Sequence, residues 1–144
     1  MARAPHAVPG RATVVDVAAT DSRPPPADTR AGLGALGEQI AVRYLTDAGL
    51  TVLDRNWRFW RGELDVVARD GDALVFCEVK ARRGTGYGVP AAAVTADKQQ
   101  RLRLLARAWL AAHDEHARDI RFDVVAVLVT RGRPARVTHL RAAF

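Results

Sequence analysis

The sequence predicts an α/β domain in which a mixed central sheet is flanked by helices on opposite faces. Three observations support this fold class. Two helical patterns bracket three strand-like segments, an Asp-Gly pair joins two of these segments, and a later apolar run is typical of a strand buried on both faces. The expected order is α-β-β-β-α-β, and 144 residues are enough for one domain with a sizeable core.

The first 30 residues mix Pro, Ala, Arg and Asp without a sustained period and include three consecutive prolines. This composition predicts a disordered tail over residues 1–30 and a folded domain over residues 31–144. The run TVVDV at 13–17 could instead pair as an edge strand, although the residues around it favour a disordered tail. The tail holds four Arg and three Asp, so most of the net charge of +6 belongs to the folded part.

A helix is predicted over about residues 34–48. Gly49 follows this segment and supplies a stop signal at the C-terminal end. The apolar residues recur at helical spacing, namely Leu36, Ile40, Tyr44 and Leu45.

Three strand-like segments follow, at 51–60, 62–69 and 73–81. They are rich in β-branched and aromatic residues, and the sequence DGD between the last two is a tight hairpin signal. We therefore expect an antiparallel meander.

The second half begins with a Gly-rich loop at 82–90. A second helix is predicted over 95–113, with Thr95 as its N-cap and an apolar face formed by Leu102, Leu105, Trp109 and Leu110. The run IRFDVVAVLV at 120–129 is expected to be a strand buried on both faces, and 135–140 a weaker final strand.

Composition excludes several classes of protein. Cys77 is the only cysteine, so no disulfide framework can form and a reducing compartment is expected. The four histidines are scattered, and His113 with His116 lacks the further ligands of a zinc site. No segment is apolar enough to span a membrane, and no secretory signal is evident, so we expect a cytoplasmic protein without a membrane partner. The positive charge favours a polyanionic partner, above all nucleic acid.

Charged residues interrupt the two strands joined by the Asp-Gly turn. With this turn, residue i pairs near residue 143 − i, which places Asp65 opposite Glu78. Because side chains alternate along a strand, Glu63, Asp65 and Val67 are expected on one side of theirs. Two facing carboxylates repel each other, and a Mg²⁺ ion would relieve that repulsion. Lys80, two residues after Glu78, would then lie beside a metal-bound water. The alternative is a cross-strand ion pair of Lys80 with Glu63 or Asp65, with Glu78 facing solvent.

Glu38 is a further candidate carboxylate if the first helix packs over this edge of the sheet. It lies in the first turn of the predicted helix, where the helix dipole alone favours an acid, so both explanations stand at this point.

Basic residues surround the acidic set. Arg103 and Arg107 share one face of the second helix and could follow phosphates, although a solvated helix face explains them equally well. Trp57, Phe59 and Trp60 are either core residues or base-stacking residues. The candidate nucleic-acid-binding residues are Arg58, Arg61, Arg82, Arg83, Lys98, Arg103 and Arg107.

Several motifs resemble a known family. The segments GLGALGEQIAVRYLTDAGLTVLDRNWR, GELDVVARDGDALVFCEVKAR, AVTADKQQRL and RFDVVAV, with the closing AAF, are similar to the YraN family of small bacterial proteins. That family is similar to archaeal Holliday junction resolvases of the PD-(D/E)xK nuclease superfamily. The resemblance runs from about Gly34 to Phe144.

The resemblance implies a restriction-endonuclease-like αβββαβ core. It also implies a catalytic set of Glu38, Asp65, Glu78 and Lys80, in which Glu38, Asp65 and Glu78 bind the metal. Glu63 and Gln99 are secondary candidates, for positioning or for a second metal.

The expected function is metal-dependent hydrolysis of phosphodiester bonds in DNA, with Mg²⁺ or Mn²⁺ as cofactor. Branched substrates such as Holliday junctions, and a homodimer that places two sites on two strands, are part of this expectation. The alternative is a non-catalytic nucleic-acid-binding module in DNA repair or processing. RNA is a less favoured substrate, because no RNA-binding motif is recognised.

Overall fold

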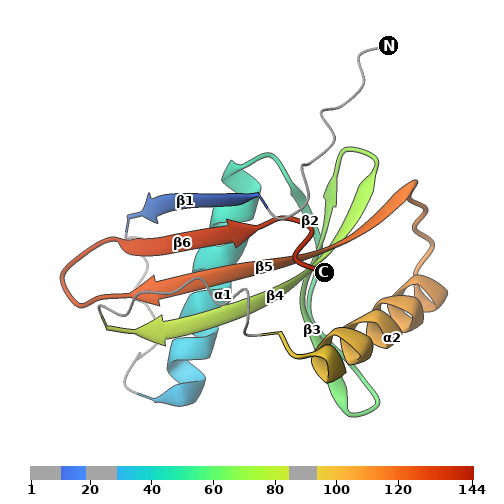
Figure 1. The fold of residues 1–144 in the computed structure, drawn as a ribbon, viewed down its shortest axis with the longest axis horizontal. Helices are drawn as coiled ribbons and strands as arrows, with labels where there is room; N and C mark the ends of the chain where they lie inside the picture. The colour runs from blue at the N-terminus through green and yellow to red at the C-terminus, as the bar shows by residue number, and fades with distance from the viewer. Residues whose placement is uncertain (1–10, 19–28, 85–93) are drawn as a thin grey trace.

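The computed structural model describes residues 11–18, 29–84 and 94–144, which form two helices and one six-stranded sheet (Figure 1). Neither helix of this described part is long and apolar enough to cross a membrane. The helices are α1 (Arg30–Asp47) and α2 (Ala96–Ala112). The strands are β1 (Ala12–Val17), β2 (Thr51–Phe59), β3 (Gly62–Asp70), β4 (Ala73–Arg83), β5 (Asp119–Val129) and β6 (Ala135–Leu140).

The sheet is mixed, with strand order β1-β6-β5-β4-β3-β2. β4 and β5 are parallel neighbours, while the other adjacent strands run antiparallel. The α2 segment connects the two parallel strands, as a crossover must. The α/β fold class with a mixed central sheet is confirmed, and the arrangement is consistent with a restriction-endonuclease-like core.

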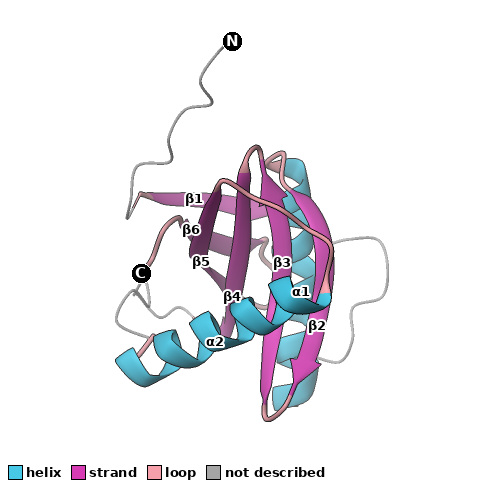
Figure 2. Cartoon of the chain, turned by 90° about the vertical axis from the view of Figure 1, so that its right-hand side faces the viewer, coloured by secondary structure: helices cyan, strands magenta, loops and turns pink. Residues whose placement is uncertain are grey.

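The two helices cover opposite faces of the sheet (Figure 2). Because both faces are covered, β5 is buried almost throughout its middle, as its continuous apolar run predicts. The cluster on the α1 side includes Ala41, Tyr44, Leu45, Val125 and Val137. The cluster on the α2 side includes Phe76, Leu102, Leu105, Trp109 and Phe122.

Side-chain caps fix where both helices begin. Thr95 is the N-cap of α2, as predicted, and its hydroxyl accepts a hydrogen bond from the N–H of Lys98 at 3.2 Å. Thr29 does the same for α1 by accepting from the N–H of Gly32 at 2.9 Å. The α1 helix therefore begins four residues before the predicted start, because apolar periodicity does not reveal this cap.

The hairpin between β3 and β4 has the predicted register. Asp70 pairs with Ala73 across a turn in which Gly71 has a positive φ of 57°, and the pairing continues to Val66 with Cys77. These pairs follow the expected rule of 143 − i. The strand pairing ends at Val66, one residue before Asp65 would pair with Glu78.

The N-terminal region departs from the expected tail over residues 1–30. Residues 12–17 form β1, which pairs antiparallel with β6 from Ala12 with Leu140 to Val17 with Ala135. Val15 and Val17 pack against the cluster on the α1 side, so this strand covers an edge that β6 would otherwise leave unpaired. Residues 1–10 and 19–28, like most of the predicted loop at 82–90, lie outside the described residues.

Candidate active site

The α1 helix approaches β4 closely at Gly37. A Cβ atom added at Gly37 would lie 2.5 Å from the Cβ of Ala81, so only a glycine allows this contact. Glu38 is the next residue, and the contact therefore sets it beside the sheet. Glu38 lies eight residues after Arg30, more than two turns at about 3.6 residues per turn. Its predicted place in the first turn is wrong, and the helix dipole does not account for it.

Asp65 lies where the side chains of β3 change face. Leu64 packs on the α2 side of the sheet, whereas Val66 packs on the α1 side only two residues later. Strict alternation would put both on one side, so the expected shared face of Glu63, Asp65 and Val67 does not hold across this point. The Asp65 carboxylate is turned toward β4, where its Oδ2 accepts a hydrogen bond from the N–H of Val79 at 2.9 Å.

Three carboxylates converge at this point. One ligand atom from each of Glu38, Glu63 and Asp65 lies within 4.8 Å of the other two. The three acids come from α1 and β3, and each is partly buried. Oxygen ligands in such a group are what Mg²⁺ and Mn²⁺ prefer. The sequence prediction placed Glu63 second to Glu78, whereas the structure brings Glu63 together with Glu38 and Asp65. We call these three residues the three-carboxylate cluster.

The surroundings of Glu38 and Asp65 oppose the ionisation of these two carboxyl groups. Burial raises the pKa of Asp65, and the charge of Glu78 raises it further, to about 7, although the hydrogen bond from Val79 opposes this shift. Burial also raises the pKa of Glu38. A hydrogen bond from Asn56 lowers this pKa, whereas the charge of Glu63 raises it further. A divalent cation would remove this cost by compensating the negative charge.

Glu78 is buried on β4 and is neutralised by two lysines. Its Oε1 lies 2.5 Å from Nζ of Lys98 and 3.6 Å from Nζ of Lys80. The alternative prediction of a solvent-facing Glu78 is therefore wrong. Burial lowers the pKa of Lys80, and Lys98 lowers it further. Burial alone would lower the pKa of Lys98, but its hydrogen bond with Glu78 contributes to a net rise.

Lys98 was predicted as a nucleic-acid-binding residue. In the structure its ammonium group forms an ion pair with the buried Glu78. The sequence does carry a signal for this position. Lys98 precedes Leu102 by four residues, so it continues the buried stripe of α2.

Asn56 is a contributor that sequence analysis missed. It lies within β2 with a positive φ of 52°, a conformation that asparagine tolerates better than most residues. Its side chain is hydrogen-bonded to Glu38, the acid that α1 supplies. No spacing rule links a helix residue to this strand, so the contact could not be predicted.

Gln99 and the remaining basic candidates are not members of the three-carboxylate cluster. The Gln99 side chain donates to the carbonyl of Val94 at 3.1 Å, and Nε of Arg58 lies 3.6 Å from a carboxylate oxygen of Glu63. The guanidinium of Arg103 lies over the rings of Phe122 and Phe144, at 5.2 and 5.4 Å. The other basic candidates are exposed, namely Arg61, Arg82, Arg83 and Arg107.

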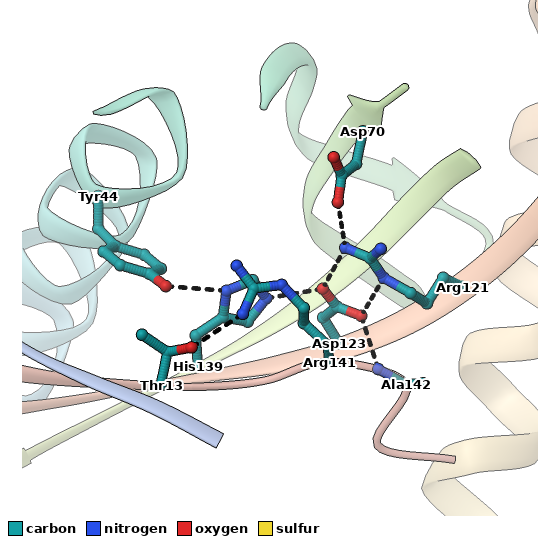
Figure 3. Close-up of polar contacts among 8 residues, drawn as sticks. All are labelled: Thr13, Tyr44, Asp70, Arg121, Asp123, His139, Arg141 and Ala142. Atoms are coloured by element: carbon teal, nitrogen blue, oxygen red, sulfur yellow. Dashed lines mark hydrogen bonds and ion pairs between the residues drawn. The ribbon is translucent and has the colours of Figure 1, made fainter. Parts of the chain in front are cut away.

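A second polar group is buried between α1 and the sheet, and sequence analysis also missed it (Figure 3). His139 and Asp123 are fully buried, and Nε2 of His139 lies 2.6 Å from Asp123. Burial alone would raise the pKa of Asp123, but hydrogen bonds from His139 and Arg121 hold it below its ordinary value. Tyr44 connects α1 to Nδ1 of His139 at 3.1 Å, and Arg121 also reaches Asp70 at 2.9 Å. These contacts connect α1 to β3, β5 and β6.

Comparison with known proteins places the chain in a family. Residues 37–127 match the model of the uncharacterised protein family UPF0102, which is the YraN family. The chain belongs to this family. The UPF0102 span includes the three-carboxylate cluster, Glu78 and both lysines, while β1 and β6 lie outside it.

Relatives in other bacteria are similar over most of their length. A UPF0102 protein of Rhodococcus opacus (strain B4) is 54% identical over 112 residues, which cover 78% of this chain and 95% of the relative. One from Beutenbergia cavernae is 59% identical over 109 residues, 76% of this chain and 92% of the relative. One from Mycolicibacterium vanbaalenii is 53% identical over 114 residues, 79% of this chain and 94% of the relative. The shared name states no activity.

Proposed function

We propose that the chain is a metal-dependent endonuclease that hydrolyses phosphodiester bonds in DNA. The observation that carries this proposal is the three-carboxylate cluster beside Glu78 and Lys80, in which Asp65 has a pKa raised to about 7 by burial and by Glu78. Perturbed carboxylates of this kind are concentrated at functional sites. The resemblance of the YraN family to junction resolvases supports DNA, and branched DNA in particular, as the substrate.

The residues fit a divalent cation. Glu38, Glu63 and Asp65 would hold Mg²⁺ or Mn²⁺ through their carboxylate oxygens, and the raised pKa values of Glu38 and Asp65 reflect the burial and repulsion that such a cation relieves. When bound, the cation supplies Lewis-acid polarisation of a phosphate and activation of water.

The protein contributes positive charge next to this site. Lys80 lies against Glu78, and burial lowers its pKa, so its ammonium group can release a proton more readily than an exposed lysine. We expect Lys80 to stabilise negative charge on the phosphate or to receive a proton from the attacking water. Lys98 holds the Glu78 carboxylate in place and is a positioning residue.

The test is cleavage of labelled four-way junction, flap, single-stranded and duplex DNA, with an RNA strand of the same sequence, in Mg²⁺ or Mn²⁺. We expect wild-type cleavage of DNA that falls by at least about 100-fold in Asp65→Asn and Lys80→Ala. Asp72→Asn is the matched control, because Asp72 is an exposed acid at the β3–β4 turn. Wild-type protein that binds these DNAs but cleaves none of them with either metal would overturn the proposal.

One observation favours a second candidate, a non-catalytic nucleic-acid-binding module. The charge of Glu78 is already compensated by Lys80 and Lys98, so this part of the site is stable without a cation. Under this alternative the basic surface binds nucleic acid and divalent metals change neither stability nor binding. Thermal unfolding in a titration with Mg²⁺ or Mn²⁺ separates the two candidates.

A further inference from the structure

The turn between β2 and β3 carries the most exposed large apolar side chain among the described residues. Phe59 pairs with Gly62, so Trp60 and Arg61 are the two residues of the turn. Trp60 is 89% exposed. The turn lies at the lower end of the β2–β3 hairpin in Figure 2.

Trp60 is unfavourable at this position for folding alone. Its φ is 57°, in the left-handed region that bulky residues rarely adopt, and glycine or asparagine is usual in a two-residue hairpin turn. Its indole gains almost no burial in return. Strain of this kind persists at functional sites, where the side chain is needed for another purpose.

The neighbours of Trp60 are aromatic and cationic. Phe59 is 50% exposed and stacks on Trp57 with a centroid distance of 5.4 Å and parallel ring planes. Trp57 itself packs against the core on the α2 side, so it supports Phe59 from beneath. The side chain of Arg58 is 82% exposed, and Arg61 is also exposed. Aromatic rings and arginine cations are the groups that bind the bases and phosphates of a nucleic-acid strand.

This turn is directly connected to the three-carboxylate cluster. Arg58 pairs with Glu63 across the hairpin, both in strand register and by the ion pair at 3.6 Å. Glu63 belongs to the three-carboxylate cluster. A strand that reaches the cluster therefore passes close to Trp60.

We propose that Trp60 stacks on an unpaired base of the DNA strand presented for cleavage, while Arg58 and Arg61 contact its phosphates. The proposal rests on the proposed function and narrows the substrate to DNA with unpaired bases near the cleaved bond, as in flaps, open junctions and single strands. Base-paired duplex offers no open base face along its length. A second copy of this chain is a less suitable partner for the Trp60 turn, because two identical cationic turns would repel each other.

The test measures binding in EDTA, so that it does not depend on cleavage. Fluorescence anisotropy would compare a labelled single strand, a flap and a blunt duplex of equal length against wild type, Trp60→Ala and Trp60→Phe. Leu104→Ala is the matched control, because Leu104 is 57% exposed on α2. We expect Trp60→Ala to weaken binding to the single strand and flap by about 5- to 100-fold and duplex binding by less than about 2-fold. Trp60→Phe should retain most of the affinity, and Leu104→Ala all of it.

A stability measurement distinguishes this role from a structural one. Trp60→Gly removes the strained backbone and should raise Tm while it weakens binding to single strands. A loss of both Tm and affinity would indicate a structural role and overturn the proposal. The proposal would also be overturned if Trp60→Ala lost affinity equally for duplex and single strand, or lost none. A change of oligomeric state in Trp60→Ala, measured by sedimentation, would overturn it as well. Wild type that binds no DNA would overturn the proposed function as well, whereas unaltered binding by Trp60→Ala rejects only the stacking role.

Discussion

Asp65 and Val79 are joined by a hydrogen bond at the place where β3 and β4 stop pairing. Oδ2 of Asp65 accepts from the N–H of Val79 at 2.9 Å, and the last paired residues are Val66 and Cys77. The carboxylate is thus fixed by the backbone even though burial and the charge of Glu78 raise its pKa to about 7. The fold holds an acid in a position where its ionisation is unfavourable, which has measurable consequences.

The first prediction is that Asp65→Asn changes how stability depends on pH. The folded-state pKa of Asp65 is about 7, above the ordinary value of 3.8, so the folded state retains the proton longer than the unfolded state. The contribution of Asp65 to stability therefore falls as pH rises from about 4 to about 7. Asparagine does not ionise, and its amide oxygen can still accept from Val79. In EDTA we expect Asp65→Asn to exceed wild type in unfolding free energy by about 1–2 kcal/mol at pH 8, with a smaller difference at pH 5.

Urea unfolding at several pH values measures this difference. Asp72→Asn removes an exposed carboxylate elsewhere and should leave the wild-type pH profile unchanged. Parallel pH profiles for wild type and Asp65→Asn would show that the pKa of Asp65 is not raised in the folded state.

The second prediction concerns divalent metals. Mg²⁺ or Mn²⁺ bound by the three-carboxylate cluster relieves the repulsion among Glu38, Glu63 and Asp65, so it should stabilise the folded state. At a metal concentration about 100 times Kd, the gain in unfolding free energy is about 2.7 kcal/mol. Thermal unfolding in a metal titration, at constant ionic strength maintained with NaCl, measures the gain. Asp65→Asn and Glu38→Gln should lose most of it, and a wild-type Tm that does not respond to either metal would favour the binding module.

The sequence predicts the secondary structure around this site better than the contacts between its side chains. The hairpin register, the Thr95 cap and the buried face of α2 follow from local rules, and the structure has all three. The ion pair of Glu78 with Lys98 joins β4 to α2, which are separate elements in the sequence, so no local spacing defines it. The contact between His139 and Tyr44 spans 95 residues of sequence. Such contacts depend on how the helices dock on the sheet, which periodicity does not specify.

The acidic site shows the same limit in more detail. The rule of 143 − i correctly aligns β3 with β4, but it treats β3 as a regular strand with alternating side chains. The change of face between Leu64 and Val66 turns Asp65 toward Val79 and brings it near Glu63 and Glu38. A local break in alternation leaves no mark in the composition of the segment, so sequence alone favoured Glu78 as the partner of Asp65.

The third prediction is that Lys98 stabilises the fold by compensating Glu78. Lys98→Met removes one of the two cations beside a buried carboxylate and should lower the unfolding free energy by about 2 kcal/mol. This estimate is below the usual cost for a fully buried pair, because the Lys98 side chain is 31% exposed and Lys80 remains. Arg101→Met, on the exposed side of α2, is the matched control and should change stability little.

A double-mutant cycle isolates this interaction. The combined variant Glu78→Gln with Lys98→Met should be more stable than the sum of the single effects predicts, by about 1–2 kcal/mol. Additive effects in urea unfolding would mean that the two side chains do not interact in solution.

The last prediction tests how Gly37 positions Glu38. Gly37→Ala places a methyl group 2.5 Å from the Cβ of Ala81, so α1 must move away from β4 and take Glu38 with it. We expect a loss of about 1–3 kcal/mol in unfolding free energy, together with a weaker stabilisation by Mg²⁺ or Mn²⁺. Gly34→Ala is the matched control in the same helix, because a Cβ at Gly34 meets no atom within 4 Å. It should stabilise the protein by about 0.5–1 kcal/mol and keep the full metal response. If both variants keep that response, the close approach at Gly37 serves packing alone and does not position Glu38 for a cation.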